Sequence, residues 1–377
     1  MDNKNNNITL FINSLRGGGA ERICVTLANG LVARGWEVTI VVLNLHNAIL
    51  AEELDKGIVF KNLNIKHARG AFFKILHFLK KNRVEKIVTF NHQISVILVL
   101  LRWVFKLNFI IVARNISHLS QKYKEEKSVW HRYFVDRWVK FLYKFVDRVI
   151  AQSQGMRTDL ISNYHIVPEK IFVINNPLNP VIERQAQETF CSWEEKQDYL
   201  LCVGRLEKVK AFDYAIEAFA KIHKDFPEMR LKIIGEGSER EYLERFTKQL
   251  KLEEFVDFEG YKKDLALYYL SAKATLLTSL YEGFPNVLVE SVAFGTPVVA
   301  FDCESGPAEI INNDVNGYIV EYQNIDILGE AINKTLSRHW DTKAIRQSVE
   351  PYRDHFIIDR YCEIFDFQLM QNNCKRY

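Results

Sequence analysis

Runs of apolar residues with the length of a β-strand recur along the chain, and amphipathic stretches of helix length separate them. Six runs lie in the first half, at residues 8–13, 38–44, 86–91, 109–114, 148–153 and 171–175. Six more follow, at 199–204, 231–235, 256–260, 274–278, 297–301 and 318–320. The runs are continuous in Val, Ile and Phe rather than alternating with polar residues, which is typical of parallel strands covered on both faces. The pattern predicts an α/β fold with two Rossmann-like, doubly wound parallel sheets.

The best candidate for a linker is the segment Asn-Asn-Pro-Leu-Asn-Pro at 175–180, because its prolines and asparagines interrupt strands and helices. We place the domain boundary near residue 185, which gives domains at 1–185 and 186–345 and a C-terminal helical segment at 346–377. Ligands of such sheets bind outside the carboxyl ends of the strands. Two facing units therefore predict a ligand site in the cleft between them.

Two segments of the first half are apolar over a greater length. Residues 96–112 contain Arg102 and Lys106, and each charge at the centre of a bilayer costs about 2.5 kcal/mol or more, so we predict a helix followed by a buried strand. At 130–146 aromatic residues repeat with a helical period, and Arg137, Lys140, Lys144 and Arg148 form a separate basic stripe. The second segment is either a core helix with a solvated basic side or a helix that borders an anionic membrane.

Composition excludes disordered and fibrous proteins, because 48% of the 377 residues are apolar and 26% are charged. Charge is divided unevenly: 27 basic and 14 acidic residues give +13 over 1–185, whereas 23 and 33 give −10 over 186–377. The first half suits an anionic partner, which is either nucleic acid, a phospholipid surface or a phosphorylated substrate. Because the six cysteines form no Cys-x-x-Cys pair and the N-terminal residues lack a secretory pattern, we expect a cytoplasmic protein.

A glycine-rich segment, Gly17-Gly18-Gly19-Ala20-Glu21-Arg22, directly follows the first apolar run and opens a helix. Glycines let the backbone approach a ligand, and the N–H groups at a helix N-terminus favour an anion. The alternative is a tight turn without a ligand. A nicotinamide dinucleotide site is disfavoured, because Arg22 stands where its fingerprint needs a third glycine and no acidic residue ends the second run.

Three cations follow the run at 199–204, namely Arg205, Lys208 and Lys210. Cations so close together repel one another unless an anion lies between them, and a diphosphate would supply that charge. A solvated basic turn is the alternative. The nearby Gly235-x-Gly237 has a similar form but is a weak signal.

Two carboxylates, Glu282 and Glu290, flank the start of another predicted helix, in which Pro285 suits the first turn. At this spacing they can accept hydrogen bonds from separate hydroxyl-bearing rings of one ligand. A further loop, 304–309, again follows a strand and offers small residues and an acid. Four such loops at strand ends favour one phosphorylated, hydroxyl-rich ligand.

These motifs together resemble those of the retaining GT-B glycosyltransferases of the family 4 (group 1) type. The resemblance rests on Gly18 to Arg22, Gly204-Arg205-Leu206 with Lys210, Glu282-x7-Glu290, and Ser305-Gly306-Pro307-Ala308-Glu309. It implies that Arg205 and Lys210 bind the diphosphate of a nucleotide sugar, Glu290 the ribose hydroxyls and Glu282 the transferred sugar. Backbone groups that would line the donor belong to Gly18, Gly19, Gly204, Phe284, Pro285, Asn286 and Val287. It also implies that the C-terminal segment crosses back to pack on the first domain.

Two points in this resemblance concern single positions. The family usually has Gly after the lysine, whereas this chain has Ala211. The family also tends to place a histidine of the first domain near the donor sugar, for which His118 is the first candidate and His92 the competitor.

The resemblance implies retaining transfer of a hexose or N-acetylhexosamine, and we expect a uridine-linked donor. No Asp-x-Asp motif occurs, so we expect Arg205, Lys210 and helix N–H groups to replace a metal, with no cofactor. The expected acceptor is a lipid-linked glycan of lipopolysaccharide, O-antigen or capsule-type assembly at the inner face of the cytoplasmic membrane. The alternative acceptor is an oligosaccharide or another soluble molecule. The alternative functions are a GT-B nucleotide-sugar epimerase and a nucleic-acid-binding protein, and the second of these is poorly supported because the cations are interleaved with core helices.

Overall fold

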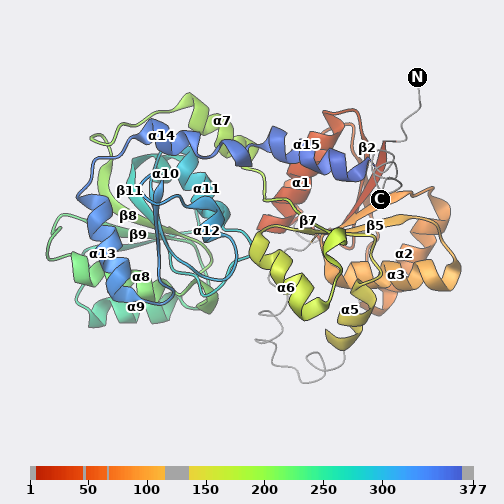
Figure 1. The fold of residues 1–377 in the computed structure, drawn as a ribbon, viewed down its shortest axis with the longest axis horizontal. Helices are drawn as coiled ribbons and strands as arrows, with labels where there is room; N and C mark the ends of the chain where they lie inside the picture. The colour runs from red at the N-terminus through yellow and green to blue at the C-terminus, as the bar shows by residue number, and fades with distance from the viewer. Residues whose placement is uncertain (1–5, 46–47, 66–67, 115–135, 367–377) are drawn as a thin grey trace. The chain divides into compact units, whose positions relative to one another are not determined.

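The computed structural model describes residues 6–45, 48–65, 68–114 and 136–366, which belong to two compact units (Figure 1). The first unit comprises Met1–Pro177 together with Asp354–Tyr377, and the second comprises Leu178–Arg353. Each unit is built on one parallel sheet. The predicted pair of parallel α/β units is confirmed, while the cleft between them stays a prediction.

The first unit has a seven-stranded sheet in the order β3-β2-β1-β4-β5-β6-β7. Its strands are β1 Asn7–Ile12, β2 Glu37–Val42, β3 Val59–Asn62, β4 Lys86–Thr89, β5 Ile110–Arg114, β6 Arg148–Ala151 and β7 Ile171–Val173. Of the strands in the described part of the unit, the sequence pattern missed β3 alone. This edge strand pairs with β2 alone and has no buried residue, so it lacks the continuous apolar run of a covered strand.

The helices of the first unit cover both faces of this sheet. They are α1 Gly19–Val32, α2 Ala68–Lys81, α3 His92–Phe105, α5 Asp136–Tyr143, α6 Gln154–Tyr164 and α15 Asp354–Phe365. Successive residues of β1 enter different cores: Leu10 packs in the core that contains α1 and α15, and Phe11 packs in the core that contains α2, α3 and α6. This alternation explains why the strands have no polar face.

The second unit has a six-stranded parallel sheet in the order β10-β9-β8-β11-β12-β13. Its strands are β8 Gln197–Val203, β9 Arg230–Ile234, β10 Val256–Gly260, β11 Ala272–Leu277, β12 Val298–Phe301 and β13 Gly317–Val320. Its α-helices are α7 Pro180–Glu188, α8 Phe212–Ile222, α9 Arg240–Gln249, α10 Ala266–Ser271, α11 Asn286–Ala293, α12 Pro307–Ile310, α13 Ile325–Leu336 and α14 Thr342–Gln347. The loops at the carboxyl ends of these strands carry the predicted donor residues.

The units divide at Pro177 and Leu178 rather than near residue 185. Helix α7 belongs to the second unit because it packs against α10 and α11, and Asn179 caps it by accepting a hydrogen bond from Val181 N–H at 3.0 Å. The chain returns from the second unit to the first after Arg353 rather than near residue 345. There α14 packs on α11, and Arg346 donates to backbone oxygens at the end of α7.

Helix α15 lies in the first unit although it comes last in the chain. It packs against α1, and its Ile357, Ile358 and Tyr361 are fully buried there. Asp359 accepts a charge-assisted hydrogen bond from Arg34 Nε at 2.5 Å. Apolar burial and one ion pair thus hold this helix on the first unit.

The long apolar segment at 96–112 forms the end of α3 followed by strand β5. No helix among the described residues is long and apolar enough to cross a membrane.

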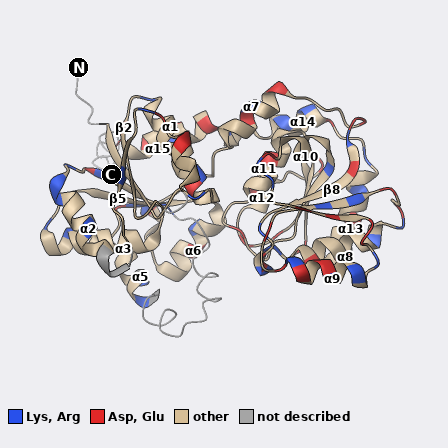
Figure 2. Ribbon diagram, turned by 180° about the vertical axis from the view of Figure 1, so that it is seen from behind, with Lys and Arg blue, Asp and Glu red and all other residues tan. Residues whose placement is uncertain are grey.

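Helix α5 departs from the prediction of a core helix with only a basic solvated side. Among its described side chains Leu142 and Tyr143 are buried, whereas the aromatic Trp138 and Phe141 are 60% and 52% exposed. The helix therefore presents aromatic as well as basic residues to solvent; Figure 2 marks its cations in blue.

Candidate functional site

The predicted phosphate-binding loop runs from the end of β8 to the start of α8. It packs against the loop after β9, where Gly204 N–H donates to Ile234 O at 3.0 Å. A Cβ atom at Gly235 would overlap Gly204 O, and one at Gly237 would overlap Leu206 O. The weak Gly-x-Gly signal therefore has a packing role, because only glycine lets these two backbones approach so closely.

Ala211 ends this loop in the left-handed region, with φ 45° and ψ 49°. This conformation costs an L-residue roughly 1–2 kcal/mol and costs glycine much less. The backbone geometry thus explains why glycine is usual here in the family that the sequence resembles, and it shows that the loop keeps this geometry with alanine.

Lys210 and Glu282 form the centre of the candidate site. Lys210 Nζ donates to Glu282 Oε1 at 2.6 Å, and the two side chains are only 20% and 12% exposed. Ser279 Oγ donates to the same carboxylate oxygen at 2.6 Å. Two donors on one oxygen fix the carboxylate while its second oxygen, Oε2, receives neither of them. The structure therefore joins two of the predicted residues and adds Ser279, which the sequence analysis did not identify.

Arg205 lies at the surface of the same loop. Its side chain is 73% exposed, and its guanidinium is paired with Glu207. No contact joins it to Lys210 or Glu282 among the described residues. A guanidinium on the solvent side of the loop remains able to turn toward an incoming anion.

The start of α11 carries the predicted backbone groups. Phe284 is buried, Pro285 caps the helix, and Asn286 and Val287 begin it. Asn286 N–H donates to Phe284 O at 3.1 Å, so this group already has a partner. Gly306, with φ +103°, lies against Pro285, and a Cβ atom there would overlap the proline ring. The loop after β12 thus packs directly on the start of α11, as close approach at a positive φ requires.

Glu290 is held one turn further along α11. The hydroxyl of Tyr269, from α10, donates to Glu290 Oε2 at 2.9 Å. Tyr269 is fully buried, and burial together with the Glu290 charge raises the pKa of its phenol well above the ordinary value. The phenol therefore stays a donor at neutral pH and orients the carboxylate.

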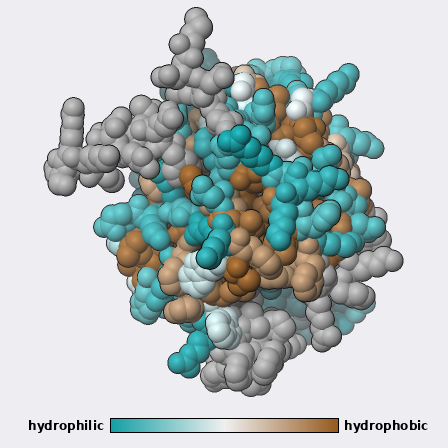
Figure 3. Space-filling model, turned by 90° about the vertical axis from the view of Figure 1, so that its right-hand side faces the viewer, coloured by the Kyte–Doolittle hydropathy of each residue, from teal (hydrophilic) through white to brown (hydrophobic). Residues whose placement is uncertain are grey.

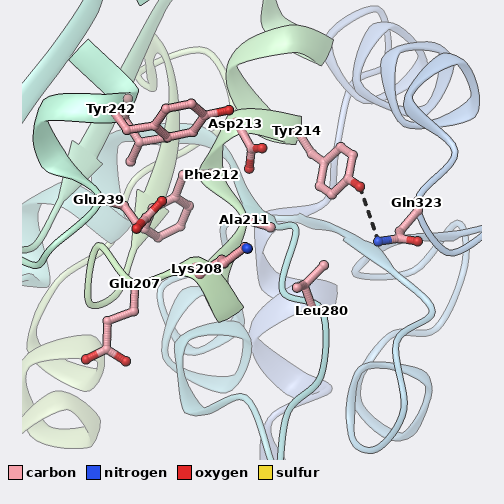
Figure 4. Close-up of a pocket in the computed structure, with 11 residues that line it drawn as sticks. Glu207, Lys208, Ala211, Phe212, Asp213, Tyr214, Glu239, Tyr242, Leu280 and Gln323 are labelled. Carbon is pink, nitrogen blue, oxygen red and sulfur yellow. Dashed lines mark hydrogen bonds between the residues drawn. The ribbon is translucent and has the colours of Figure 1, made fainter. Parts of the chain in front are cut away.

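A cavity of ≈ 420 Å³ lies beside the N-terminus of α8 (Figure 4). Lys208, Ala211 and Leu280 line it, and the Tyr214 hydroxyl accepts a hydrogen bond from Gln323 at its edge at 3.2 Å. None of Arg205, Lys210, Glu282 and Glu290 is among its lining residues. The cavity borders the loop that carries Lys210 without enclosing the predicted donor groups.

The first unit has its own cavity, of ≈ 490 Å³, at the carboxyl ends of β1, β2 and β4. Ser14, Arg16, Glu21 and Asn91 are among its lining residues. The glycine-rich turn is adjacent, since Gly18 caps α1 and a Cβ atom there would overlap the Glu21 carboxylate. Gly18 and Gly19 thus lie near a pocket of the first unit.

The two histidine candidates are not equally placed. His92 is buried, 8% exposed, as the first residue of α3. His118 lies outside the described residues. The choice between them stays a prediction.

Comparisons with known proteins match both halves of the chain. Residues 184–349 match the family described as Glycosyl transferases group 1, and residues 17–181 match Glycosyltransferase Family 4. The chain is 25% identical over 355 residues to the amylovoran biosynthesis glycosyltransferase AmsD of Erwinia amylovora, covering 93% of this chain and 96% of AmsD.

A second relative matches over a shorter segment. It is the N-acetylgalactosamine-N,N'-diacetylbacillosaminyl-diphospho-undecaprenol 4-alpha-N-acetylgalactosaminyltransferase of Campylobacter jejuni, 31% identical over 198 residues, 52% of this chain and 53% of the relative. Among solved structures, Anabaena HepE in complex with UDP and glucose superposes with a TM-score of 0.75 at 19% identity, covering 96% of this chain and 99% of HepE. That likeness supports the GT-B fold.

Proposed function

The chain belongs to the group 1, family 4 glycosyltransferases, and we propose that it transfers a hexose or N-acetylhexosamine from a UDP-sugar to a lipid-linked glycan acceptor. The observation that carries the proposal is the Lys210–Glu282–Ser279 cluster at the carboxyl edge of the second sheet. It places a cation and a fixed carboxylate side by side, which matches the phosphate and the hydroxyls of a nucleotide sugar.

In this proposal each part of the nucleotide sugar is bound by its own set of residues. Lys210 and Arg205 bind the diphosphate, with the N-terminus of α11 adding its dipole. Glu282 accepts from sugar hydroxyls through Oε2, because Lys210 and Ser279 both donate to Oε1. Glu290, oriented by Tyr269, accepts from the ribose. The Anabaena HepE structure, which contains UDP and glucose, supports a donor of this class.

We further propose retaining transfer without a metal ion. The bond from the anomeric carbon to the β-phosphate oxygen breaks, and a bond to the acceptor hydroxyl oxygen forms on the same face. The acceptor proton passes to the leaving phosphate, whose growing negative charge Lys210 and Arg205 stabilise. Lys210 is held in place by Glu282 before the reaction, so little reorganisation is needed when that charge develops.

The acceptor proposal has two supports. The name of the Campylobacter relative specifies a diphospho-undecaprenol acceptor, and that of AmsD specifies amylovoran biosynthesis. The first half carries the excess of basic residues that a diphosphate-linked lipid and an anionic leaflet would meet. We assign the acceptor to the cavity of the first unit, beside Arg16 and Asn91. The enzyme would then act in assembly of a lipopolysaccharide, O-antigen or capsule-type glycan at the cytoplasmic face of the membrane.

The test is a panel of UDP-, GDP- and dTDP-sugars with a polyprenyl-diphosphate-linked disaccharide, read by mass spectrometry and by the anomeric coupling constant of the product. The proposal predicts one UDP-sugar that extends the lipid-linked acceptor with its α-configuration retained. Lys221→Ala is the matched control for Lys210→Ala, because Lys221 Nζ also lies 2.6 Å from a carboxylate, that of Asp326, but at the exposed end of α8. Extension of free oligosaccharides alone would favour a soluble acceptor, and conversion of the donor without an acceptor would favour an epimerase.

A further inference from the structure

The first unit exposes large apolar side chains on three of its helices. They are Phe73 of α2, Trp103, Val104 and Phe105 of α3, Trp138 and Phe141 of α5, and Phe145 just beyond α5. Their exposed fractions run from 36% for Phe105 to 71% for Phe73. We call these seven residues the aromatic face.

Several rings of the aromatic face contact neighbouring rings. Trp103 and Phe145 lie 4.5 Å apart between centroids, and Phe141 lies 5.5 Å from Phe145. On the other side, the half-buried Phe72 joins Phe73 at 5.5 Å and Phe105 at 6.3 Å. The rings thus form two clusters: one links α3 to α5 and the residues just beyond it, and the other links α2 to the end of α3. Figure 3 views the end of the unit where Figure 1 shows α2 and α3, and apolar residues are gathered there among polar ones.

Packing within the unit does not require this surface. Helix α3 already buries Ile94, Leu98 and Leu101 in the core, and α5 buries Leu142 and Tyr143. The exposed rings lie on other sides of the same helices. Exposed apolar side chains that gather in clusters, unlike singly scattered ones, point to an interaction site.

Charge indicates what the surface meets. Helices α2, α3 and α5 contain seven Lys or Arg residues and a single acidic residue, Asp136. Lys81 and Lys106 are exposed, and Lys80 Nζ lies 4.9 Å from the centre of the Phe105 ring. Lys74 is exposed too, but its Nζ donates to the backbone oxygens of Leu63 and Asn64. Arg102 is compensated by Asp147 at 2.5 Å, but no carboxylate contacts these lysines among the described residues. Aromatic rings surrounded by lysines fit the boundary between lipid headgroups and acyl chains, where rings insert and ammonium groups reach phosphates.

We propose that the aromatic face inserts into the interface of an anionic bilayer. The inference deepens the proposed function and rests on it for the choice of a lipid-linked acceptor. It differs from docking by the basic stripe of Arg137, Lys140 and Lys144 alone. A purely electrostatic contact is screened at 1 M salt, whereas insertion of rings is not.

The experiment is flotation of the full-length protein with vesicles of phosphatidylethanolamine and phosphatidylglycerol, or of phosphatidylcholine alone, at 0.1 M and 1 M salt. The test variant is Phe73→Ser, Trp138→Ser and Phe141→Ser, three exposed positions whose change leaves the core intact. The control variant carries Phe190→Ser, Tyr261→Ser and Leu267→Ser on the second unit, where the exposed fractions of 52%, 74% and 71% match those of the test set.

We expect the wild type and the control to bind anionic vesicles and to keep part of that binding at 1 M salt. We expect the test variant to lose about 10-fold or more in partitioning at both salt concentrations. Equal partitioning of the test and control variants would overturn the proposal. So would wild-type self-association in sedimentation velocity that the test variant loses, because a second copy would then cover the face.

The two proposals fail separately. If the test variant floats like the wild type and the wild type transfers sugar, the proposed insertion of the aromatic face is wrong and the proposed function stands. If the wild type binds vesicles through these rings but turns over no nucleotide sugar, the surface stands and the function is wrong. UDP binding by the test variant, measured by calorimetry, should equal that of the wild type, since the rings belong to the first unit.

Discussion

Removing the ammonium group of Lys210 should separate its structural contribution from its catalytic one. Nζ donates to Glu282 Oε1 at 2.6 Å, and both side chains are mostly shielded from water. Lys210→Ala leaves that carboxylate with Ser279 as its remaining donor of the cluster. A hydrogen bond to a charged group contributes about 1.5–3 kcal/mol, and the residual exposure of both groups favours the lower part of that range. We expect the free energy of unfolding to fall by about 1–2 kcal/mol.

Turnover should fall much further than stability explains. Loss of one group that stabilises the leaving charge costs about 10²-fold or more in kcat, which is about 2.7 kcal/mol of transition-state stabilisation. The assay is kcat for UDP release, measured well below the temperature at which the variant unfolds, so that the folded fraction is the same for all proteins.

A double-mutant cycle isolates the pair. Urea unfolding of Lys210→Ala, Glu282→Gln and the double variant should give a coupling energy of about 1–2 kcal/mol, because a neutral amide in place of the carboxylate no longer needs the cation. The exposed pair Lys221–Asp326, with the same 2.6 Å separation, is the control, and its coupling energy should be much smaller because water screens both charges. Equal coupling energies for the two pairs would rule out extra stabilisation by the buried pair, and a Lys210→Ala enzyme with wild-type kcat would rule out the proposed role of Lys210 in catalysis.

Three further predictions concern single residues. Ala211→Gly should raise the free energy of unfolding by about 0.5–1 kcal/mol in urea titrations, because φ is 45° there, and an equal or lower value would contradict the left-handed geometry. Arg205→Ala should lower kcat about 10²-fold with little change in the urea midpoint, since the side chain is 73% exposed. A chelator should leave the wild type active; activity that is lost in chelator and restored by Mg²⁺ would show that a metal ion stabilises the charge on the leaving phosphate. Burial lowers the pKa of Lys196 to about 8 from 10.5, so between those pH values the unfolded chain binds more protons than the folded one and stability rises with pH. Relative to Lys196→Met, the free energy of unfolding of the wild type should increase by about 3 kcal/mol from pH 7 to 10.5. A difference between the two proteins that does not change with pH would show that the lysine is not buried as described.

The strands were predictable because burial on both faces leaves a continuous apolar run. Only β3 was missed, since an exposed edge strand lacks that signal. The first unit ends several residues earlier than predicted, because Asn179 and Pro180 cap and begin α7, which packs in the second unit. A linker pattern cannot show with which unit the following helix will pack.

In the site, motif spacing identified Lys210 and Glu282, whose contact the structure shows. The supporting groups were harder to identify. Ser279 lies three residues before Glu282 and looks like an ordinary polar residue, and Tyr269 reaches Glu290 from another helix, 21 residues away in the chain. The aromatic repeat of α5 was visible, but a helical period does not say which side faces the core, and here Trp138 faces solvent.

The most direct test of the proposed function is calorimetric titration of UDP, followed by measurement of sugar transfer, on wild type and the Glu282→Gln and Lys210→Ala variants. We expect UDP to bind the wild type at one site and Lys210→Ala to weaken that binding. We expect Glu282→Gln to keep UDP binding but to lose transfer about 10²-fold, since its carboxylate meets the sugar rather than the nucleotide. A wild-type protein that binds no nucleoside diphosphate, or a Glu282→Gln protein that transfers sugar at the wild-type rate, would contradict it.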